Sequence, residues 1–278
     1  MLPSLTDRLH VFLGPQRIDL IRYGRGFKPK EIMRDTLPCR VAESNEPLWL
    51  PAIEALKKLL SQQDGKLDVL VSFSNHFVQY LLVQSQEGLS TKSEEEAYVK
   101  FCFSEIYGKQ ADHFELRWSG DLSIDAQIAS AVEQEFLSAI DEVLESRSMA
   151  CRALQPSFMN AFNLMRHRIA SDAQWFVFVE PGCILIGFFK SGVCANIRRI
   201  RVSSHWKNEL PSLLTREFNG LAVDNKQGNI LICAPEHLEL RSLPLAGWNV
   251  EVIQLDQPLL LSGQFLPVGI SENSHAAA

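Results

Sequence analysis

The chain has 278 residues, of which 46% are hydrophobic and 22% are charged, and its formal net charge is -6. This length allows one large domain or two of ordinary size, and the hydrophobic content is enough for a buried core. The acidic balance argues against a general nucleic-acid-binding protein, which normally carries a basic surface, and the cluster Arg198, Arg199 and Arg201 is too small to change that.

Neither a membrane span nor a secretory signal is predicted. The most apolar stretch, residues 175–193, is interrupted by Glu180, Pro181 and Lys190, whereas a span needs about 20 mostly apolar residues. The first residues lack a basic region followed by an apolar one. The six cysteines show no C-x-x-C pair and no histidine at zinc-ligand spacing, which favours free thiols in a reducing compartment. We therefore expect a soluble cytoplasmic protein.

The first 84 residues predict two pairs of strands with a helix between them. Apolar runs flank Gly14-Pro15-Gln16, which favours a hairpin, and two further strand-like runs lie on either side of Ser74-Asn75. The helix begins at Pro51 and places apolar residues along one face. The stretch through Arg40 is rich in turn residues and is expected to be a loop. The expected elements are strands at 10–13 and 17–23, a helix at 51–62, and strands at 67–73 and 77–84.

Three helices and two strands are expected in the next part of the chain. Residues 124–146 give the clearest helical pattern, because Ile128, Val132, Phe136 and Ile140 recur at steps of four. The expected elements are a helix at 91–108, a strand at 113–120, the helix at 124–146, a strand at 149–156 and a helix that begins at Ser157.

The second half predicts three consecutive strands, because its apolar runs are broken at Glu180-Pro181-Gly182 and again at Ser191-Gly192. The expected elements are strands at 175–179, 184–190 and 193–202, a helix at 206–221, and strands at 229–235 and 248–255. Since hairpin-type connections recur, this is a mixed α/β chain rather than a purely parallel sheet. We expect a first subdomain over residues 1–156, a second over 157–270 and a disordered tail over 271–278.

Three strands in a meander, followed by a helix, strand, helix and strand, and built twice, resemble the duplicated actin-like (ribonuclease H-like) ATPase fold. Within that fold the sequence is most similar to the PilM-type proteins of type IV pilus assembly and their relatives in MSHA-pilus and type II secretion systems. The resemblance extends over about residues 11–255. The motifs that carry it are VFLGPQRIDLIRYGRG, LDVLVSFSNHFVQYLLVQ, ALQPSFMNAFNLMRHRI and the strand-turn-strand around Glu180.

The chain departs from the nucleotide-binding members of this fold at each of their contact points. Those members carry Asp-x-Gly in two turns, where backbone N–H groups approach phosphate and a carboxylate orients Mg²⁺. Here the first turn has no carboxylate, and Pro15 and Pro181 each remove an amide donor. The late strand leads into Glu236-His237 instead of a glycine pair. The remnants of the phosphate turns are Gly14, Arg17, Glu180 and Gly182.

The roles of these remnants stay open at this level. Arg17 is either a phosphate contact or an exposed hairpin arginine, and Glu180 is either a metal ligand or a structural carboxylate. Ser72, Ser74 and His76 lie close in sequence, but the G-x-S-x-G pattern of a nucleophile elbow is missing, so a polar turn is the simpler interpretation. We expect no catalytic residue, no resident metal and no cofactor, while residual binding of ATP and Mg²⁺ stays open.

The resemblance implies a non-catalytic assembly protein in the cytoplasm, held at the inner membrane by the cytoplasmic tail of a pilus or secretion protein. The alternative is an ATP-binding enzyme of the actin and sugar-kinase fold, either an ATPase or a phosphotransferase. A third possibility is an α/β protein of unrelated role. Intact Asp-x-Gly turns would favour the enzyme, and the degraded turns favour the assembly protein.

Overall fold

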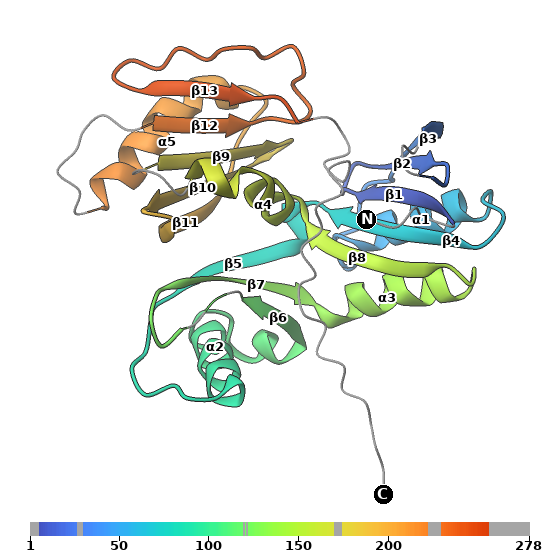
Figure 1. The fold of residues 1–278 in the computed structure, drawn as a ribbon, viewed down its shortest axis with the longest axis horizontal. Coiled ribbons are helices and arrows are strands. Elements are labelled where there is room, and N and C mark those ends of the chain that lie inside the picture. Colours follow the sequence, from blue (N-terminus) through green and yellow to red (C-terminus); the bar gives the residue numbers. More distant parts are fainter. Residues whose placement is uncertain are drawn as a thin grey trace, which may run out of the picture.

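The computed structural model describes residues 6–26, 30–118, 120, 122–169, 174–221 and 229–255. The expected tail at 271–278 lies outside these residues. The described residues form two five-stranded sheets and one three-stranded sheet (Figure 1). The two larger sheets lie in separate halves of the molecule.

The first half is a mixed sheet in the order β3-β2-β1-β4-β8. Its meander is antiparallel, and β1, β4 and β8 run parallel to one another. Because parallel neighbours need a crossover, helices precede β4 and β8. The elements are β1 (Asp7–Leu13), β2 (Arg17–Tyr23), β3 (Glu31–Pro38), α1 (Leu50–Leu60), β4 (Leu67–Phe73), α3 (Gln134–Glu145) and β8 (Ala150–Pro156).

The second half repeats the same strand order as β11-β10-β9-β12-β13, with the same strand directions. The predicted mixed α/β class and duplicated layout are therefore confirmed. The elements are β9 (Gln174–Glu180), β10 (Cys183–Lys190), β11 (Val193–Arg201), α5 (Trp206–Asn219), β12 (Asn229–Cys233) and β13 (Asn249–Ile253).

A small antiparallel sheet, β5-β7-β6, is inserted between β4 and α3 and packs against α2. The helix α4 (Ser157–Ile169) then leads from β8 into the second half. The inserted elements are the short 3-10 turn η1 (Asn75–Phe77), β5 (Val78–Val83), α2 (Lys92–Tyr107), the 3-10 turn η2 (Gly108–His113), β6 (Phe114–Trp118) and β7 (Gln127–Glu133).

Two predictions about single elements are wrong. The stretch expected to be a loop contains β3, an edge strand on which Met33 and Leu37 pack against the core while the exposed positions include Glu31, Arg34 and Thr36. The expected helix at 124–146 is divided into β7 and α3. β7 carries apolar residues on both faces, because one face packs in the cluster with α2 and the other packs against the cores of the two halves, and this pattern matched a helical spacing. Its side chains Ile128, Ala129 and Val132 are buried.

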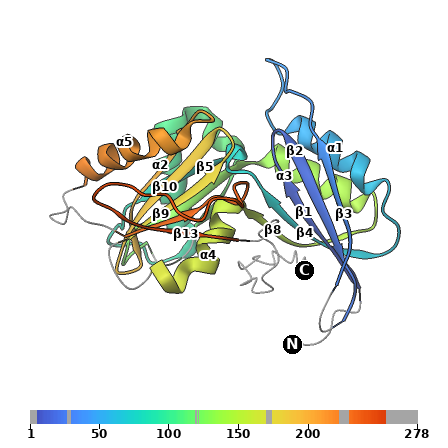
Figure 2. The ribbon, with the colours of Figure 1, turned by 90° about the horizontal axis from the view of Figure 1, so that it is seen from above.

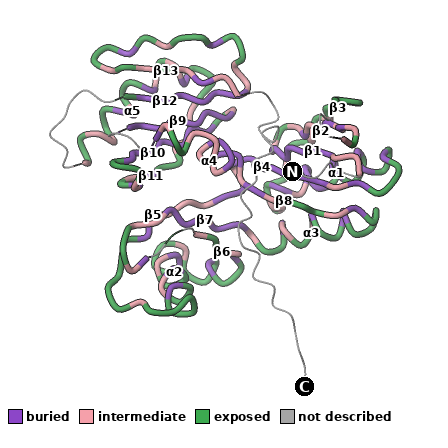
Figure 3. The backbone as a smooth tube through the Cα atoms, viewed as in Figure 1, coloured by how far each residue is buried: buried purple, intermediate pink, exposed green. Residues whose placement is uncertain are grey.

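Helices cover the two large sheets differently. α1 and α3 pack on the same face of the first sheet, whereas α4 and α5 cover opposite faces of the second (Figure 2). Since β9 and β10 lie in the middle of that second sheet, nearly all their residues are buried (Figure 3). This burial explains their continuous apolar sequence and the sharp interruption at Glu180-Pro181-Gly182.

Phe136 on α3 is the residue whose loss we expect to destabilise the first half most. Its side chain is fully buried, and its ring centroid lies 5.6 Å from that of Trp49, 5.5 Å from Phe73 and 5.1 Å from Phe77. Phe136→Ala should lower the free energy of unfolding by about 3–5 kcal/mol, measured by urea denaturation.

The matched control is Phe101→Ala on α2, because the Phe101 side chain is 58% exposed. That substitution should change the free energy of unfolding by no more than about 0.5 kcal/mol. Equal losses in the two variants would contradict the packing described for α3.

Candidate functional site

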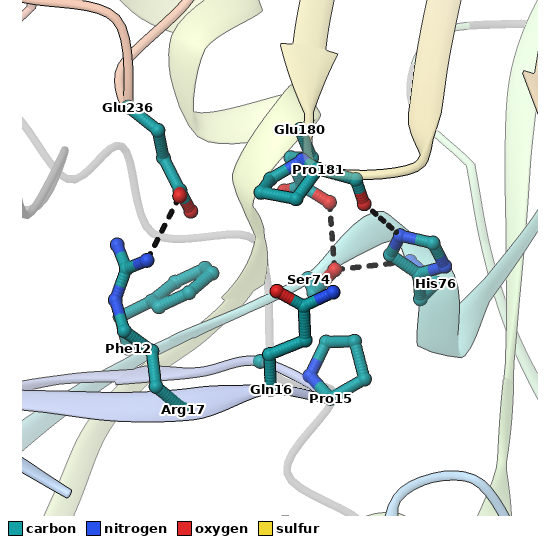
Figure 4. Close-up of a pocket in the computed structure, with 10 residues that line it drawn as sticks. Phe12, Pro15, Gln16, Arg17, Ser74, His76, Glu180, Pro181 and Glu236 are labelled. Carbon is teal, nitrogen blue, oxygen red and sulfur yellow. Dashed lines mark hydrogen bonds and ion pairs between the residues drawn. The ribbon is translucent and has the colours of Figure 1, made fainter. Parts of the chain in front are cut away.

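The turns marked by the sequence meet in a cleft between the two halves (Figure 4). Because the two sheets share one strand order, the β1–β2 and β9–β10 turns occupy equivalent positions, and both reach the cleft. Its empty space is about 270 Å³, including space open to solvent. The lining residues are Phe12, Gly14, Pro15, Gln16, Arg17, Ser74, His76, Glu180, Pro181 and Glu236.

Three of the four predicted remnants, Gly14, Arg17 and Glu180, line this cleft. Gly182 lies in the same turn as Glu180 but is not a lining residue. It adopts a φ of +76°, a conformation that favours glycine, and its carbonyl accepts a hydrogen bond from the Val202 amide. Its place in the turn therefore follows from backbone geometry.

The carboxylate of Glu180 is buried and is bound by the first half of the chain. It accepts hydrogen bonds from the Ser74 hydroxyl at 2.6 Å, the Asn75 amide at 3.0 Å and the Asn75 Nδ2 at 3.0 Å. The Oδ1 atom of Asn75 in turn accepts from the Tyr80 hydroxyl at 2.7 Å and from the Phe158 amide at 3.2 Å. Both oxygens of Glu180 thus have partners within the protein, as a buried carboxylate requires.

Burial dominates the proton affinity of this network. It raises the pKa of Glu180 from 4.5 to about 7, although the Ser74 hydroxyl and the Asn75 amide oppose the rise. Burial also lowers the pKa of His76 and raises that of Tyr80. The Nε2 atom of His76 lies 2.9 Å from the Pro181 carbonyl, so this nitrogen carries the proton in the neutral ring.

An ion pair crosses the cleft from the first half to the second. The Arg17 Nη1 atom lies 2.8 Å from a carboxylate oxygen of Glu236, which follows β12, and its Nε atom lies 3.1 Å from Asp19. The pKa of Arg17 is raised, because hydrogen bonding to Glu236 and the two negative charges outweigh burial. The guanidinium that the sequence offered as a phosphate contact is therefore paired with carboxylates.

In the β1–β2 turn, backbone groups form hydrogen bonds with each other. The Gly14 amide donates to the Arg17 carbonyl at 3.0 Å. A Cβ atom at position 14 would lie 3.0 Å from that carbonyl and from the Phe12 ring, so the close approach within the turn itself accounts for Gly14. Pro15 and Pro181 have no N–H to donate.

The Ser74 and His76 side chains are not arranged as a nucleophile hydrogen-bonded to its base. The Ser74 hydroxyl donates to Glu180, and the His76 ring faces the Pro181 carbonyl. Ser74 is also only 2% exposed, which keeps a substrate away. The segment is a polar turn that binds the other half of the chain.

The sequence interpretation missed Asn75, Tyr80 and Arg199 as parts of this site. Arg199, counted only as one of three nearby arginines, donates to the carbonyls of Asn75 at 3.0 Å and His76 at 3.2 Å. The polar residues directly after the buried strand β4 could have indicated a binding site, but the sequence does not show which groups they bind.

The described residues include neither a metal-binding cluster nor a membrane-spanning helix. In that part of the chain, no group of three or more His, Cys, Asp or Glu side chains is arranged to hold a metal ion. Within the same residues, no helix is long and apolar enough to cross a membrane.

Solved structures confirm the actin-like fold. A chain of the PilM-PilN type IV pilus biogenesis complex is 17% identical, with 88% of each chain covered and a TM-score of 0.61. The cytoplasmic domain of EpsL, an inner membrane component of the type II secretion system of Vibrio cholerae, is 13% identical, covering 90% of this chain and 91% of that one, with a TM-score of 0.58.

A protein with actin-like ATPase fold and unknown function from Bacteroides thetaiotaomicron is 11% identical over 90% of this chain and 91% of that chain, with a TM-score of 0.56. No protein-family model matches the sequence, and a search of curated proteins finds no match. The likeness is therefore one of fold, and it agrees with the resemblance inferred from the sequence.

The raised pKa of Glu180 predicts a pH-dependent stability. In the unfolded chain this carboxyl loses its proton near pH 4.5, and in the folded chain near pH 7. The folded state therefore binds more protons between these values, and the free energy of unfolding should fall as pH rises through them, by on the order of 3 kcal/mol.

Glu180→Gln removes this titration and leaves His76 unchanged, so the difference between the two proteins isolates Glu180. Urea denaturation from about pH 5 to pH 8 should show the wild-type chain losing about 2–3 kcal/mol relative to the variant. Parallel curves for the two proteins would contradict the assigned titration.

Proposed function

We propose that this chain is a nucleotide-independent assembly protein with an actin-like fold. It works in the cytoplasm at a pilus or type II secretion-like platform of the inner membrane, where it binds the cytoplasmic tail of a membrane protein. The observation that carries the proposal is that the polar side chains in the cleft are already bound to one another. The turns that hold phosphate in nucleotide-binding members of the fold are bound here to other side chains of the same chain.

Charge supports the proposal. A nucleotide brings several negative charges, and the cleft already holds Glu180 and Glu236. The positive charge of Arg17 is neutralised by Glu236 and Asp19, so a phosphate would have to displace a carboxylate before it gained this partner. Like charges at short range in a partly buried site repel one another strongly.

Space supports it as well. The volume that the centre of a water-sized sphere can occupy in the cleft is only about 20 Å³, which is room for about one water molecule and far too little for a nucleoside triphosphate. To admit a nucleoside triphosphate, the two halves would have to move apart. That movement would break the Arg17–Glu236 ion pair and expose Glu180.

The proposed partner class rests on the fold neighbours. One is a chain of a PilM-PilN complex of type IV pilus biogenesis, and another is the cytoplasmic part of an inner membrane component of a type II secretion system. Proteins that recruit peptide tails do so by adding a strand to a sheet edge or by clamping the peptide in a groove.

The first prediction is that ATP does not bind. A site with a Kd of about 50 μM would stabilise the protein by about 2.7 kcal/mol at about 5 mM ATP, enough to raise the Tm by a few degrees. We expect no such rise in a thermal-shift measurement with Mg²⁺, and no binding heat in calorimetry. An ATP-dependent rise that disappears in Glu180→Ala would overturn the proposal in favour of an ATP-binding enzyme.

The second prediction concerns the partner. Synthetic peptides with the sequences of cytoplasmic tails from the single-span membrane proteins encoded beside this chain should be tested by fluorescence anisotropy. We expect one of them to bind with a Kd of about 10 μM, or about -7 kcal/mol, with the same affinity with and without ATP. A scrambled peptide is the control. Absence of binding by every tail, or binding that requires ATP, would contradict the proposed function.

A further inference from the structure

The polar turn between β4 and β5 is the place where the first half meets the second. It contains Ser74 and η1, and its residues Ser74 and Asn75 are 2% and 0% exposed. Groups of the second half reach it from the end of β9, from the β9–β10 turn and from β11. We call Ser74, Asn75 and His76 the clamp turn.

The first set of contacts ends at the carboxylate of Glu180. Ser74 and Asn75 donate three hydrogen bonds to it, from a hydroxyl, a backbone amide and a side-chain amide. Because Glu180 is only 5% exposed, losing one of these donors leaves a carboxylate lone pair with little access to water, which costs more than losing an exposed hydrogen bond.

The second set of contacts comes from Arg199 on β11. Its Nη1 atom donates to the Asn75 carbonyl at 3.0 Å and the His76 carbonyl at 3.2 Å, and its Nη2 atom donates to Gln79 Oε1 at 3.0 Å. The same Gln79 oxygen accepts from the Tyr107 hydroxyl of α2 at 3.3 Å. Arg199 therefore joins the second sheet to both the clamp turn and the inserted subdomain.

The clamp turn also holds the helix that connects the halves. The Asn75 Oδ1 atom accepts from the Phe158 amide in the first turn of α4, and the Ser157 hydroxyl donates to the Phe73 carbonyl at 2.9 Å. Domains joined through modest interfaces are expected to move relative to each other. Here hydrogen bonds to the ionisable groups Glu180 and Arg199 connect the turn after β4 to β9 and β11, and a neutral hydrogen bond connects it to α4.

We propose that the clamp turn, bound by Glu180, Pro181 and Arg199, fixes the relative orientation of the two halves without any ligand. In other two-domain proteins a bound ligand can hold the domains in one relative orientation, and here the contacts of the clamp turn have that effect. The proposal rests on the proposed nucleotide independence, but it is tested in the absence of nucleotide. Its failure is therefore distinct from a positive result for ATP binding.

The test is hydrogen-exchange mass spectrometry of the full chain at increasing urea, with Arg199→Ala as the main variant. Arg198→Ala is the matched control, because Arg198 is the neighbouring residue on β11, its side chain is 67% exposed and its ion-pair distance to Glu217 is 3.9 Å. The double variant Arg199→Ala/Glu180→Gln weakens both sets of contacts. The peptides compared cover the clamp turn, β1 with β4, and β9 with β12.

In the wild-type chain and in Arg198→Ala, we expect the sheets of the two halves to open at the same urea concentration. In Arg199→Ala the clamp-turn amides should exchange at least tenfold faster in the absence of urea, while the sheet amides keep their protection. In the double variant the two sheets should open at separate urea concentrations.

The proposal is overturned if Arg199→Ala behaves like Arg198→Ala. It is also overturned if the two sheets already open separately in the wild-type chain, since the halves would then not be coupled. If the double variant does not fold, the single Arg199→Ala variant still decides between these outcomes.

Discussion

The buried carboxylate of Glu180 is the group on which the arrangement of the two halves depends. Moving an ionisable group out of water is costly, and here the cost is offset by hydrogen bonds from Ser74 and Asn75 and is visible in a pKa raised to about 7. These donors belong to the first half, while Glu180 ends the central strand β9 of the second. Satisfying one carboxylate therefore requires both halves to be in place, and Arg199 and α4 bind the same turn.

The same constraint explains the character of the cleft. In an actin-like fold the paired hairpin turns face each other, and a ligand between them can supply the charges that hold the halves together. In this chain Glu180 and the Arg17–Glu236 pair supply these interactions internally. The proposed function therefore implies that the fold has kept its turns and exchanged the ligand for side chains. This is the physical basis for proposing an assembly role, in which a fixed scaffold is more useful than a nucleotide-driven change.

Most helices and strands of the core were predicted from sequence patterns. The two that were not, β3 and β7, were missed for the same reason. The strands on both sides of Gly14 and Glu180 were predicted because their apolar runs are continuous and their breaks are sharp. β3 and β7 were not, because their patterns depend on position within a sheet. β3 is an edge strand and has no fully buried residue, while β7 has apolar residues on both faces because other elements pack on each, and this pattern resembles that of a helix. Neither position is encoded locally.

By itself, the sequence determined the duplicated strand-and-turn order and the residue types in the two turns, because both depend on residue type and spacing along the chain. Only the tertiary structure decided which groups these turn residues bind. Asn75 and Glu180 are separated by 105 residues, and Arg17 and Glu236 by 219, so no local pattern pairs them. Their pairing follows from the equivalent placement of two hairpin turns at one cleft, where burial makes each unpaired polar group costly and so selects its partner.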